Sequence, residues 1–271
     1  MIQSRGYKIF RFTMLVLVVL FLVLPIVWMV LAAFKTNVDI YDVAKTIAFM
    51  PTLENFTKVF AQGNFGAYII NSAVVALSAT GASLVLGVPA AFAMSRFVMN
   101  KSALVVLMAR VIPGISLLVP WYYIFSNLRL VGSLWVLILS HMFVALPLVV
   151  YIMMGFFDGL PLEIEEAGLV DGLTHIGSFW HLMVPLSRGG MATAGILSFI
   201  FSWNNFMFSL ILANEHTMTL PVALYHFMAY AGVDWGGLMA AATVMTAPII
   251  IFSLFAQKYV VGGLTAGATK G

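Results

Sequence analysis

The sequence predicts an all-α membrane protein with six transmembrane helices in one domain, residues 1–271. Hydrophobic residues make up 62% of the chain and charged residues only 8%, whereas a soluble domain carries about 25% charged residues. The mean hydropathy of +1.05 agrees with this composition. The apolar residues also gather in runs that approach or exceed the roughly 20 residues a helix needs to cross a bilayer. The expected spans are residues 12–34, 68–95, 103–125, 133–157, 191–213 and 236–257.

The first two spans flank a mixed polar segment. A basic arm, residues 1–11, precedes the first span, which contains no charged residue. The connection at residues 35–67 holds Pro51, Glu54 and Asn55, and we expect it to form short helices outside the membrane. The second span is an uncharged run, long enough to tilt or to project beyond the bilayer.

The third span is interrupted. It follows a basic turn at residues 96–102 and contains Arg110, the one charged residue deep in a span, close to Pro113-Gly114. Proline and glycine at this place predict a bend. Burying the guanidinium costs about 3 kcal/mol or more unless it is paired or faces water. Since no span carries a carboxylate, the partners open to Arg110 are carbonyls, another subunit or the aqueous pathway, and a structural or gating role is favoured.

A polar loop at residues 158–188 separates the fourth and fifth spans. It holds five of the ten acidic residues: Asp158, Glu163, Glu165, Glu166 and Asp171. Pro161 suits the first turn of a helix, and Gly172 can take the left-handed conformation that ends one. Thr174 can cap a second helix that runs towards Pro185. The loop is therefore predicted to be a helix–turn–helix.

The fifth span carries Trp203-Asn204-Asn205 near its middle. Two adjacent amides are costly to expose to lipid, so we expect them to face the helix bundle or a cavity. Residues 214–235 form an amphipathic stretch broken by Pro221. After the sixth span, residues 258–271 form a tail rich in small residues.

Lysine and arginine predict the orientation, because short cytoplasmic loops carry an excess of them. Six spans place both termini on one side of the membrane. Eight basic residues fall on that side: Arg5, Lys8, Arg11, Arg96, Lys101, Arg188, Lys258 and Lys270. Four fall on the other side: Lys35, Lys45, Lys58 and Arg129. Both termini and the loop at residues 158–188 are therefore expected to be cytoplasmic.

Missing residues exclude several kinds of chemistry. The chain has no cysteine, which excludes disulfides and thiolate metal sites. No G-x-x-x-x-G-K-[ST], G-x-S-x-G or H-E-x-x-H sequence occurs, and we expect no catalytic residue, metal or cofactor. The small positive charge is assigned to topology rather than to nucleic acid. Because no acidic residue lies in a span, coupling to protons or sodium is disfavoured, and the energy is expected to come from another chain.

The polar loop also carries a motif with long spacing. Glu166-Ala167-Gly168, three residues, Gly172, nine residues and Leu182-Met183-Val184-Pro185 follow one another. This order resembles the EAA loop of binding-protein-dependent ABC importer permeases, whose pattern is E-A-A-x3-G-x9-I-x-L-P. The register fits without a gap, and the three replacements keep size or apolar character. The tail at residues 262–271 is similar to that of the maltose-type second permease.

The resemblance implies the architecture of a type I ABC importer permease with a cytoplasmic coupling helix. The implied ATPase-coupling residues are Glu165, Glu166, Ala167, Gly168, Asp171, Gly172 and Pro185. Small residues at 167 and 168 are expected to let a groove of the ATPase approach the helix. The implied partners are a second, different permease subunit, two ATP-binding subunits, an extracytoplasmic solute-binding protein and membrane lipid. The chain is then no enzyme but a permease subunit of a bacterial or archaeal plasma membrane.

Polar and aromatic residues in the spans are candidates for lining a translocation path. They are Asn71, Arg110, His141, Trp203, Asn204 and Asn205. For His141 a structural hydrogen bond is the commoner role. Apart from Arg110 the set is neutral, and an unpaired buried ion is costly, so a sugar, oligosaccharide or polyol is the expected substrate. Two alternatives stay open: an ion-coupled transporter or channel, and a membrane scaffold for a soluble complex.

Overall fold

The computed structural model describes residues 5–61, 64–97, 99–229 and 232–268, and at residues 100, 229 and 255–268 it describes the backbone alone. This part of the chain is nearly all helical, and its two short strands form one hairpin. The chain divides into two compact units. The first comprises residues 1–65 and 224–247, and the second comprises residues 66–223 and 248–271.

The first unit begins with one long helix followed by short elements. They are α1 (Arg5–Ala33), α2 (Asn37–Tyr41), the 3-10 helix η1 (Val43–Lys45), α3 (Glu54–Ala61), the 3-10 helix η4 (Tyr225–Phe227), β1 (Met228–Ala229), β2 (Gly232–Val233) and the start of α14 (Trp235–Ala268). The short helices expected between residues 35 and 67 are thus confirmed. The basic arm was expected as a separate segment before the first span. In the structure, α1 already begins at Arg5, so most of the arm belongs to this helix.

A buried asparagine closes the end of α1. The side chain of Asn55 in α3 is 3% exposed, and its amide nitrogen donates to the carbonyl oxygens of Ala33, at 2.8 Å, and Lys35, at 2.7 Å. Carbonyls at the end of a helix have no partner within the helix, so a side-chain donor supplies one. Asn55 therefore holds α3 against the end of α1.

Two polar side chains order the start of α14. Asp234 accepts a hydrogen bond from the backbone nitrogen of Gly237 at 3.1 Å, which caps the helix. Asn37 donates to the same Asp234 oxygen at 2.8 Å and accepts from the backbone nitrogen of Gly236 at 2.8 Å. These bonds join α2 to the start of α14, almost 200 residues further along the chain.

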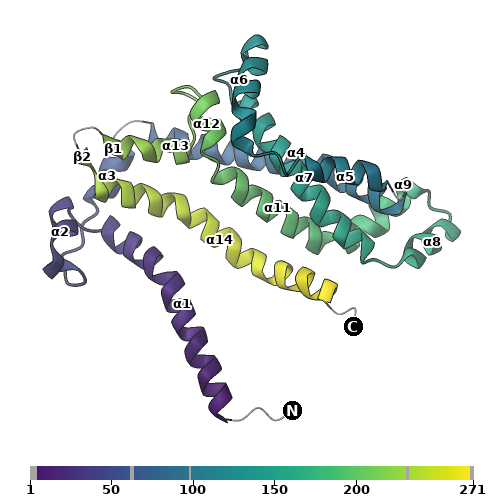
Figure 1. The fold of residues 1–271 in the computed structure, drawn as a ribbon, viewed down its shortest axis with the longest axis horizontal. Coiled ribbons are helices and arrows are strands. Elements are labelled where there is room, and N and C mark those ends of the chain that lie inside the picture. Colours follow the sequence, from purple (N-terminus) through teal and green to yellow (C-terminus); the bar gives the residue numbers. More distant parts are fainter. Residues whose placement is uncertain (1–4, 62–63, 98, 230–231, 269–271) are drawn as a thin grey trace. The chain divides into compact units, whose positions relative to one another are not determined.

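The second unit holds the remaining helices. They are α4 (Phe65–Arg96), α5 (Asn100–Met108), the 3-10 helix η2 (Gly114–Leu117), α6 (Leu118–Asn127), α7 (Leu134–Asp158), α8 (Leu162–Val170), α9 (His175–Ser178), the π-helix η3 (Phe179–Met183), α10 (Val184–Leu186), α11 (Arg188–Trp203), α12 (Met207–Leu212) and α13 (Leu220–Leu224). Within this unit α4, α7 and α11 run beside one another, and α8 and α9 lie at one end of the group (Figure 1).

The three long helices share one apolar core. Its buried members are Val88, Ala91, Phe92, Val149, Val150, Met153, Phe157, Phe179, Met183 and Ala194. Glycines mark the places where the helices come closest: a Cβ at Gly87 would lie 2.7 Å from Val149, and one at Gly190 would lie 2.5 Å from Phe156. Small residues permit such close approach between membrane helices, which associate mainly through packing.

Four of the described helices are long and apolar enough to cross a bilayer: α1, α4, α7 and α14. A fifth span is reached only by joining residues 175–186 to α11 across a bend of 73°. The expected spans at residues 103–125 and 191–213 are each broken in two, as α5 and α6 and as α11 and α12. The architecture of apolar helices is confirmed, and the count of six remains a prediction.

Local chemistry explains both breaks. The helix α5 ends at Met108, Pro113 disfavours helical conformation at the residue before it, and Gly114 opens the 3-10 turn that leads into α6. Asn204 ends α11, where its amide bonds back to Ile200 at 3.0 Å. Asn205 accepts from the backbone nitrogen of Phe208 at 3.2 Å and starts α12. The bend foreseen at Pro113 is confirmed, whereas the break at the asparagines was not foreseen.

The end of the chain also differs from expectation. The sixth span was expected to stop at residue 257 before a tail of small residues, but the backbone of α14 stays helical to Ala268. The last part of the tail, residues 269–271, lies outside the described residues.

Candidate functional site

The helix α8 presents two different faces. Its exposed face carries Glu163, Glu166, Ala167 and Val170, a spacing of i, i+3, i+4 and i+7. The opposite face buries Glu165 and Gly168. The carboxylates predicted for the loop therefore divide between solvent and the interior, and only Glu163 and Glu166 remain available to a partner on this face.

A tight turn ends α8 at Gly172. The residue has φ +90°, the left-handed conformation that the sequence predicted there. The nitrogen of Leu173 bonds to the oxygen of Gly168 at 2.9 Å, and that of Gly172 bonds to the oxygen of Leu169 at 3.1 Å. This pair of bonds satisfies two carbonyls at the helix end. It also directs the chain straight into the cap of α9.

Gly168 faces inward rather than towards a partner. A Cβ built on it would lie 2.6 Å from the Cδ1 methyl of Leu182 and 3.4 Å from Leu173. The expectation that Gly168 lets a partner groove approach is therefore wrong, because its lack of a side chain serves packing inside the loop. Ala167, on the exposed face, is the small residue that remains accessible.

Glu165 is enclosed by two basic groups. Its Oε2 atom lies 3.2 Å from Nε of Arg96, at the end of α4, and its Oε1 atom lies 3.3 Å from Nδ1 of His175, at the start of α9. The Glu165 side chain is 9% exposed and that of Arg96 is 7% exposed. A second nitrogen of Arg96, Nη2, donates to the oxygen of Leu160 at 3.2 Å.

The second half of the loop confirms the predicted cap. Thr174 accepts from the nitrogen of Gly177 at 3.1 Å and starts α9. Pro185 has no N–H to continue an α-helical ladder, and the turn before it widens to a π-helix in which Val184 bonds back to Phe179. Pro185 is also half-buried, so it shapes the loop and is not one of its exposed residues.

The turn between α8 and α9 carries exposed apolar side chains. Val170 is 86% exposed and Ile176 is 72% exposed. Asp171 is exposed between them. Together with Glu163, Glu166 and Ala167 of α8 they form what we call the docking face. A surface of this kind, three carboxylates beside apolar groups, suits a partner groove that combines a basic residue with apolar walls.

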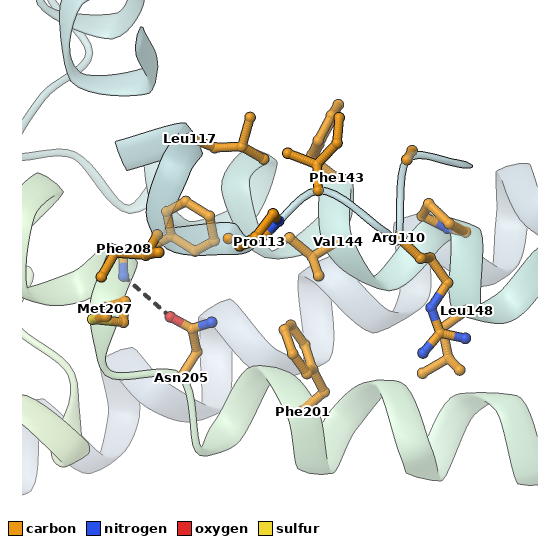
Figure 2. A pocket seen from close by; sticks show the side chains of 15 residues that line it. Arg110, Pro113, Leu117, Phe143, Val144, Leu148, Phe201, Asn205, Met207 and Phe208 are labelled. Carbon is orange, nitrogen blue, oxygen red and sulfur yellow. Dashed lines mark hydrogen bonds between the residues drawn. The ribbon is translucent and has the colours of Figure 1, made fainter. Parts of the chain in front are cut away.

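A cavity of about 420 Å³ lies where the third span breaks. Figure 2 shows Arg110 and Pro113 from the α5–α6 segment, Phe143 from α7, and Phe201 and Asn205 from the end of α11 around it. The lining is mostly aromatic and aliphatic, with one amide and one guanidinium as polar groups. Among the described residues no acidic side chain pairs with Arg110, so the cavity keeps a positive charge at its edge.

Only two of the six residues predicted for a path line this cavity, Arg110 and Asn205. Asn204 is exposed, and its amide bonds to its own helix. The expectation that both asparagines face the bundle or a cavity is wrong for Asn204, because the last turn of α11 offers it a carbonyl.

The other three predicted residues are buried in packing. His141 is 1% exposed, and its Nδ1 atom lies 2.7 Å from Oγ of Ser202, which links α7 to α11. Asn71 donates to the carbonyl oxygens of His216 and Met218 at 2.9 and 3.0 Å. Trp203 is 3% exposed and stacks on Phe199 at 5.6 Å. These contacts lie within the chain and away from the cavity, and a role of the three residues in a translocation path stays a prediction.

Sequence reasoning missed most of the cavity lining and all of the Arg96 contacts. The missed rings are Phe143, Phe201 and Phe208. Phenylalanine is frequent in this chain, with 22 residues, so no pattern separates a cavity ring from a lipid-facing one. Arg96 was assigned to topology alone. Its position at the end of a predicted span, with acidic residues in the polar loop at residues 158–188, was the available signal.

Comparison with known proteins places this geometry in a family. A family model described as "binding-protein-dependent transport system inner membrane component" matches residues 83–265, more than half of the chain. The trehalose transport system permease protein SugB of Mycobacterium tuberculosis is 35% identical over 261 residues, 94% of this chain and 95% of that protein. The trehalose/maltose transport system permease protein MalG of Thermococcus litoralis is 31% identical over 263 residues, 94% of each chain.

A solved structure extends the comparison to the fold. A bacterial ABC transporter involved in the import of the acidic polysaccharide alginate contains a chain with TM-score 0.80 to this one. The match covers 96% of this chain and 99% of that chain at 18% sequence identity. At that identity the likeness concerns the fold, and it spans nearly the whole length of both chains.

Proposed function

This chain belongs to the family of binding-protein-dependent transport system inner membrane components, and we propose that it forms half of the translocation pathway of an ATP-driven importer for a sugar, oligosaccharide or polyol. As a family member it is a multi-pass membrane permease and works with a solute-binding protein. It is a transport component, and ATP hydrolysis belongs to another subunit. The substrate class, the coupling loop, the two ATP-binding subunits and the second permease subunit are the proposed parts.

The docking face of the loop carries the coupling proposal. Glu166 and Ala167 of the motif point outward from α8, beside the exposed Val170 and Ile176. We assign to this face the contact with an ATP-binding subunit, with Glu166 paired to a basic residue of that partner. Glu165, Gly168, Gly172 and Pro185 shape the loop from inside, so their part in coupling is to hold the face in position.

Two observations support a carbohydrate substrate. Several of the relatives are named for sugars, trehalose and maltose among them. The cavity lining combines flat apolar rings with the amide of Asn205, which suits the faces and hydroxyls of a neutral sugar. The charge of Arg110 lies at the edge of the cavity, where it can hydrogen-bond a hydroxyl without demanding an anion.

The proposed orientation follows the positive charges. Eight lysines and arginines fall on the side of both termini and of the polar loop, against four on the other side. This places the docking face in the cytoplasm, where an ATP-binding subunit can reach it. Residues 214–235 then lie on the opposite side, where we propose that they reach the binding protein.

The decisive experiment is isolation of the intact complex. An affinity tag on this chain, followed by mild solubilisation, should copurify chains that carry a G-x-x-x-x-G-K-[ST] sequence, together with a second permease. Reconstituted with its binding protein, the complex should show ATPase activity stimulated by trehalose, maltose or another neutral carbohydrate or polyol.

The outcomes separate the parts of the proposal. Absence of an ATP-binding chain under mild conditions would contradict the importer assignment. Stimulation by an amino acid, a phosphate ester or a metal ion, and by no carbohydrate or polyol, would contradict the substrate class alone. No observation favours the ion-coupled transporter or the membrane scaffold as a second candidate.

A further inference from the structure

Arg96 is the last residue of α4, and its guanidinium reaches two residues of the polar loop. Nε lies 3.2 Å from Oε2 of Glu165, and Nη2 donates to the oxygen of Leu160 at 3.2 Å. The residue before it, Ser95, donates to Asp158 at the end of α7. The final turn of α4 is therefore bonded to the end of α7, to the connection after it and to α8.

Burial distinguishes this ion pair from a surface pair. The side chains of Arg96 and Glu165 are 7% and 9% exposed. Exposed pairs contribute little because solvent screens them, whereas a buried charge left without its partner is strongly unfavourable. The two residues lie 69 positions apart in the sequence, so the pair joins elements that the backbone does not connect directly.

The pair connects two parts that differ in their packing. The helix α8 packs against α9 and η3, which follow it in the chain. The helix α4 belongs to the apolar core shared with α7 and α11, through Val88, Ala91 and Phe92. A displacement of α8 reaches α4 by two routes: through η3, whose Phe179 ring lies 4.9 Å from that of Phe92 in α4, and through the Arg96–Glu165 pair, which joins α8 itself to α4.

A guanidinium is suited to this position. Its nitrogens are spread over a planar group, so Nε lies 3.2 Å from the Glu165 carboxylate, as an ion pair without a hydrogen bond from that nitrogen, while Nη2 donates to the Leu160 carbonyl. The other oxygen of Glu165 lies 3.3 Å from His175 of α9. Glu165 thus lies between α4 and α9 with one carboxylate oxygen for each.

We propose that Arg96 is a positioning residue for coupling: its ion pair with Glu165 fixes α8 to α4, so that a displacement of the docking face by an ATP-binding subunit moves α4 with it. The inference rests on the proposed coupling role of the loop. It assigns to α4 a part in conducting the movement, and it assigns to Glu165 a contact within this chain instead of a contact with the partner.

The test measures whether α8 and α4 move as one body. The chain has no cysteine, so spin labels can be placed at two exposed positions alone, Leu162→Cys in α8 and Val85→Cys in α4. Distances are measured in the complex with its copurified ATP-binding subunits, before and after trapping with ATP and vanadate. With Arg96 present, the distance should stay unchanged on trapping.

In Arg96→Gln and in Glu165→Gln the distance between the two labels should change on trapping. ATP-driven uptake should fall by about 5-fold or more, since 5-fold is the lower end of the usual effect of one site on another. The matched control is Lys101→Gln, an exposed cation of the same basic segment, which should behave as the parent chain. An unchanged distance in Arg96→Gln would overturn the inference. A failure to copurify any ATP-binding subunit with the parent chain would instead overturn the proposed function.

A second variant covers loss of structure. A broadened distance distribution in Arg96→Gln before nucleotide is added would indicate a disordered loop. In that case the charge-reversed double variant, Arg96→Glu with Glu165→Arg, tests whether the ion pair is the link. Recovery of a fixed distance and of uptake supports the ion pair as the link. No recovery means that Arg96 is needed for folding of the loop alone, which overturns the inference.

Discussion

Gly172 shows how far one residue can be read from the sequence. Its φ of +90° lies in the region that other residues occupy at a cost of roughly 1–2 kcal/mol, and no atom lies within 4 Å of a Cβ built on it. Any effect of a substitution therefore arises from the backbone conformation and not from a steric clash.

Gly172→Val is expected to destabilise the loop by about 1–2 kcal/mol or more and to impair uptake, because a β-branched residue is least tolerant of positive φ. Gly172→Asn is the matched control, since asparagine adopts this conformation at small cost. Thermal unfolding of the purified complex and uptake assays measure the two variants. Equal effects of Val and Asn would show that the conformation of Gly172 is not what matters.

Glu166 is the residue at which the docking face can be tested. Like charges placed opposite each other at an interface cost several kcal/mol, so Glu166→Lys should weaken retention of the ATP-binding subunits by more than about 10-fold and abolish uptake. Insertion into the membrane should be unaffected, because the residue is exposed. Glu54→Lys, at an exposed carboxylate outside the docking face and outside residues 214–235, is the control for the change in charge, because its exposed pair with Lys58 contributes little. Uptake at the parent rate by Glu166→Lys would contradict the assignment of the face.

Residue types in the loop were predictable, but the direction of each side chain was not. The spacing indicated Gly172 as the turn, and the structure confirms it. The same motif predicted that Glu165 and Gly168 lie at the surface, among the residues that contact the ATPase. The structure buries both, because the rotation of α8 about its axis depends on Arg96 and Leu182, which are distant from them in the sequence.

At the scale of elements, an ion pair between Asp39 and Lys45 joins α2 to η1. The hydrogen bond from Lys45 to Asp39 lowers the pKa of the Asp39 carboxyl below its usual 3.8. The same bond raises the pKa of Lys45 above its usual 10.5. A carboxylate with a lowered pKa stabilises the fold above its ordinary pKa, and a lysine with a raised pKa does so below its ordinary pKa.

Stability of this segment should therefore be constant between pH 3.8 and 10.5. It should fall as the pH drops through the lowered pKa of Asp39, and again as the pH rises through the raised pKa of Lys45. Hydrogen exchange of residues 37–46 across this range measures it, and Lys45→Met should remove both flanks. A profile of Lys45→Met identical to that of the parent chain would contradict the role of the pair.

The broken helices illustrate what element patterns conceal. The run of 23 residues at 103–125, apolar apart from Arg110 and Ser116, is long enough to cross a bilayer, yet it is divided near Pro113 and a 3-10 turn follows. The pair Pro113-Gly114 indicates this break in the sequence, whereas Pro25, Pro89, Pro147 and Pro248 lie inside continuous helices. Asn204 and Asn205 give no such signal, because asparagine also occurs within helices. Their side chains end α11 and start α12 through hydrogen bonds to the backbone of each helix end, and those bonds form only where the backbone groups are free.

At the scale of the whole molecule, the orientation is open to a direct test. Ile176 in the loop is 72% exposed and Ile47 is 83% exposed, and the chain contains no cysteine of its own. Ile176→Cys should react with a membrane-impermeant maleimide only from the cytoplasm, and Ile47→Cys only from the opposite side. Intact cells and inside-out vesicles distinguish the two sides. Exchanged labelling would overturn the orientation drawn from lysine and arginine.

The sequence by itself determined the class of the protein, its four longest spans and the helix–turn–helix of the polar loop. These features follow from local composition and spacing: apolar length, the positive φ that Gly172 permits, and the cap supplied by Thr174. Only the tertiary structure decided which carboxylates of the loop are exposed and which is buried, which residues line the cavity and how Arg96 joins α4 to α8. Those outcomes depend on contacts between residues far apart in the chain, and the rotation of each helix about its axis is set by packing that no local pattern records.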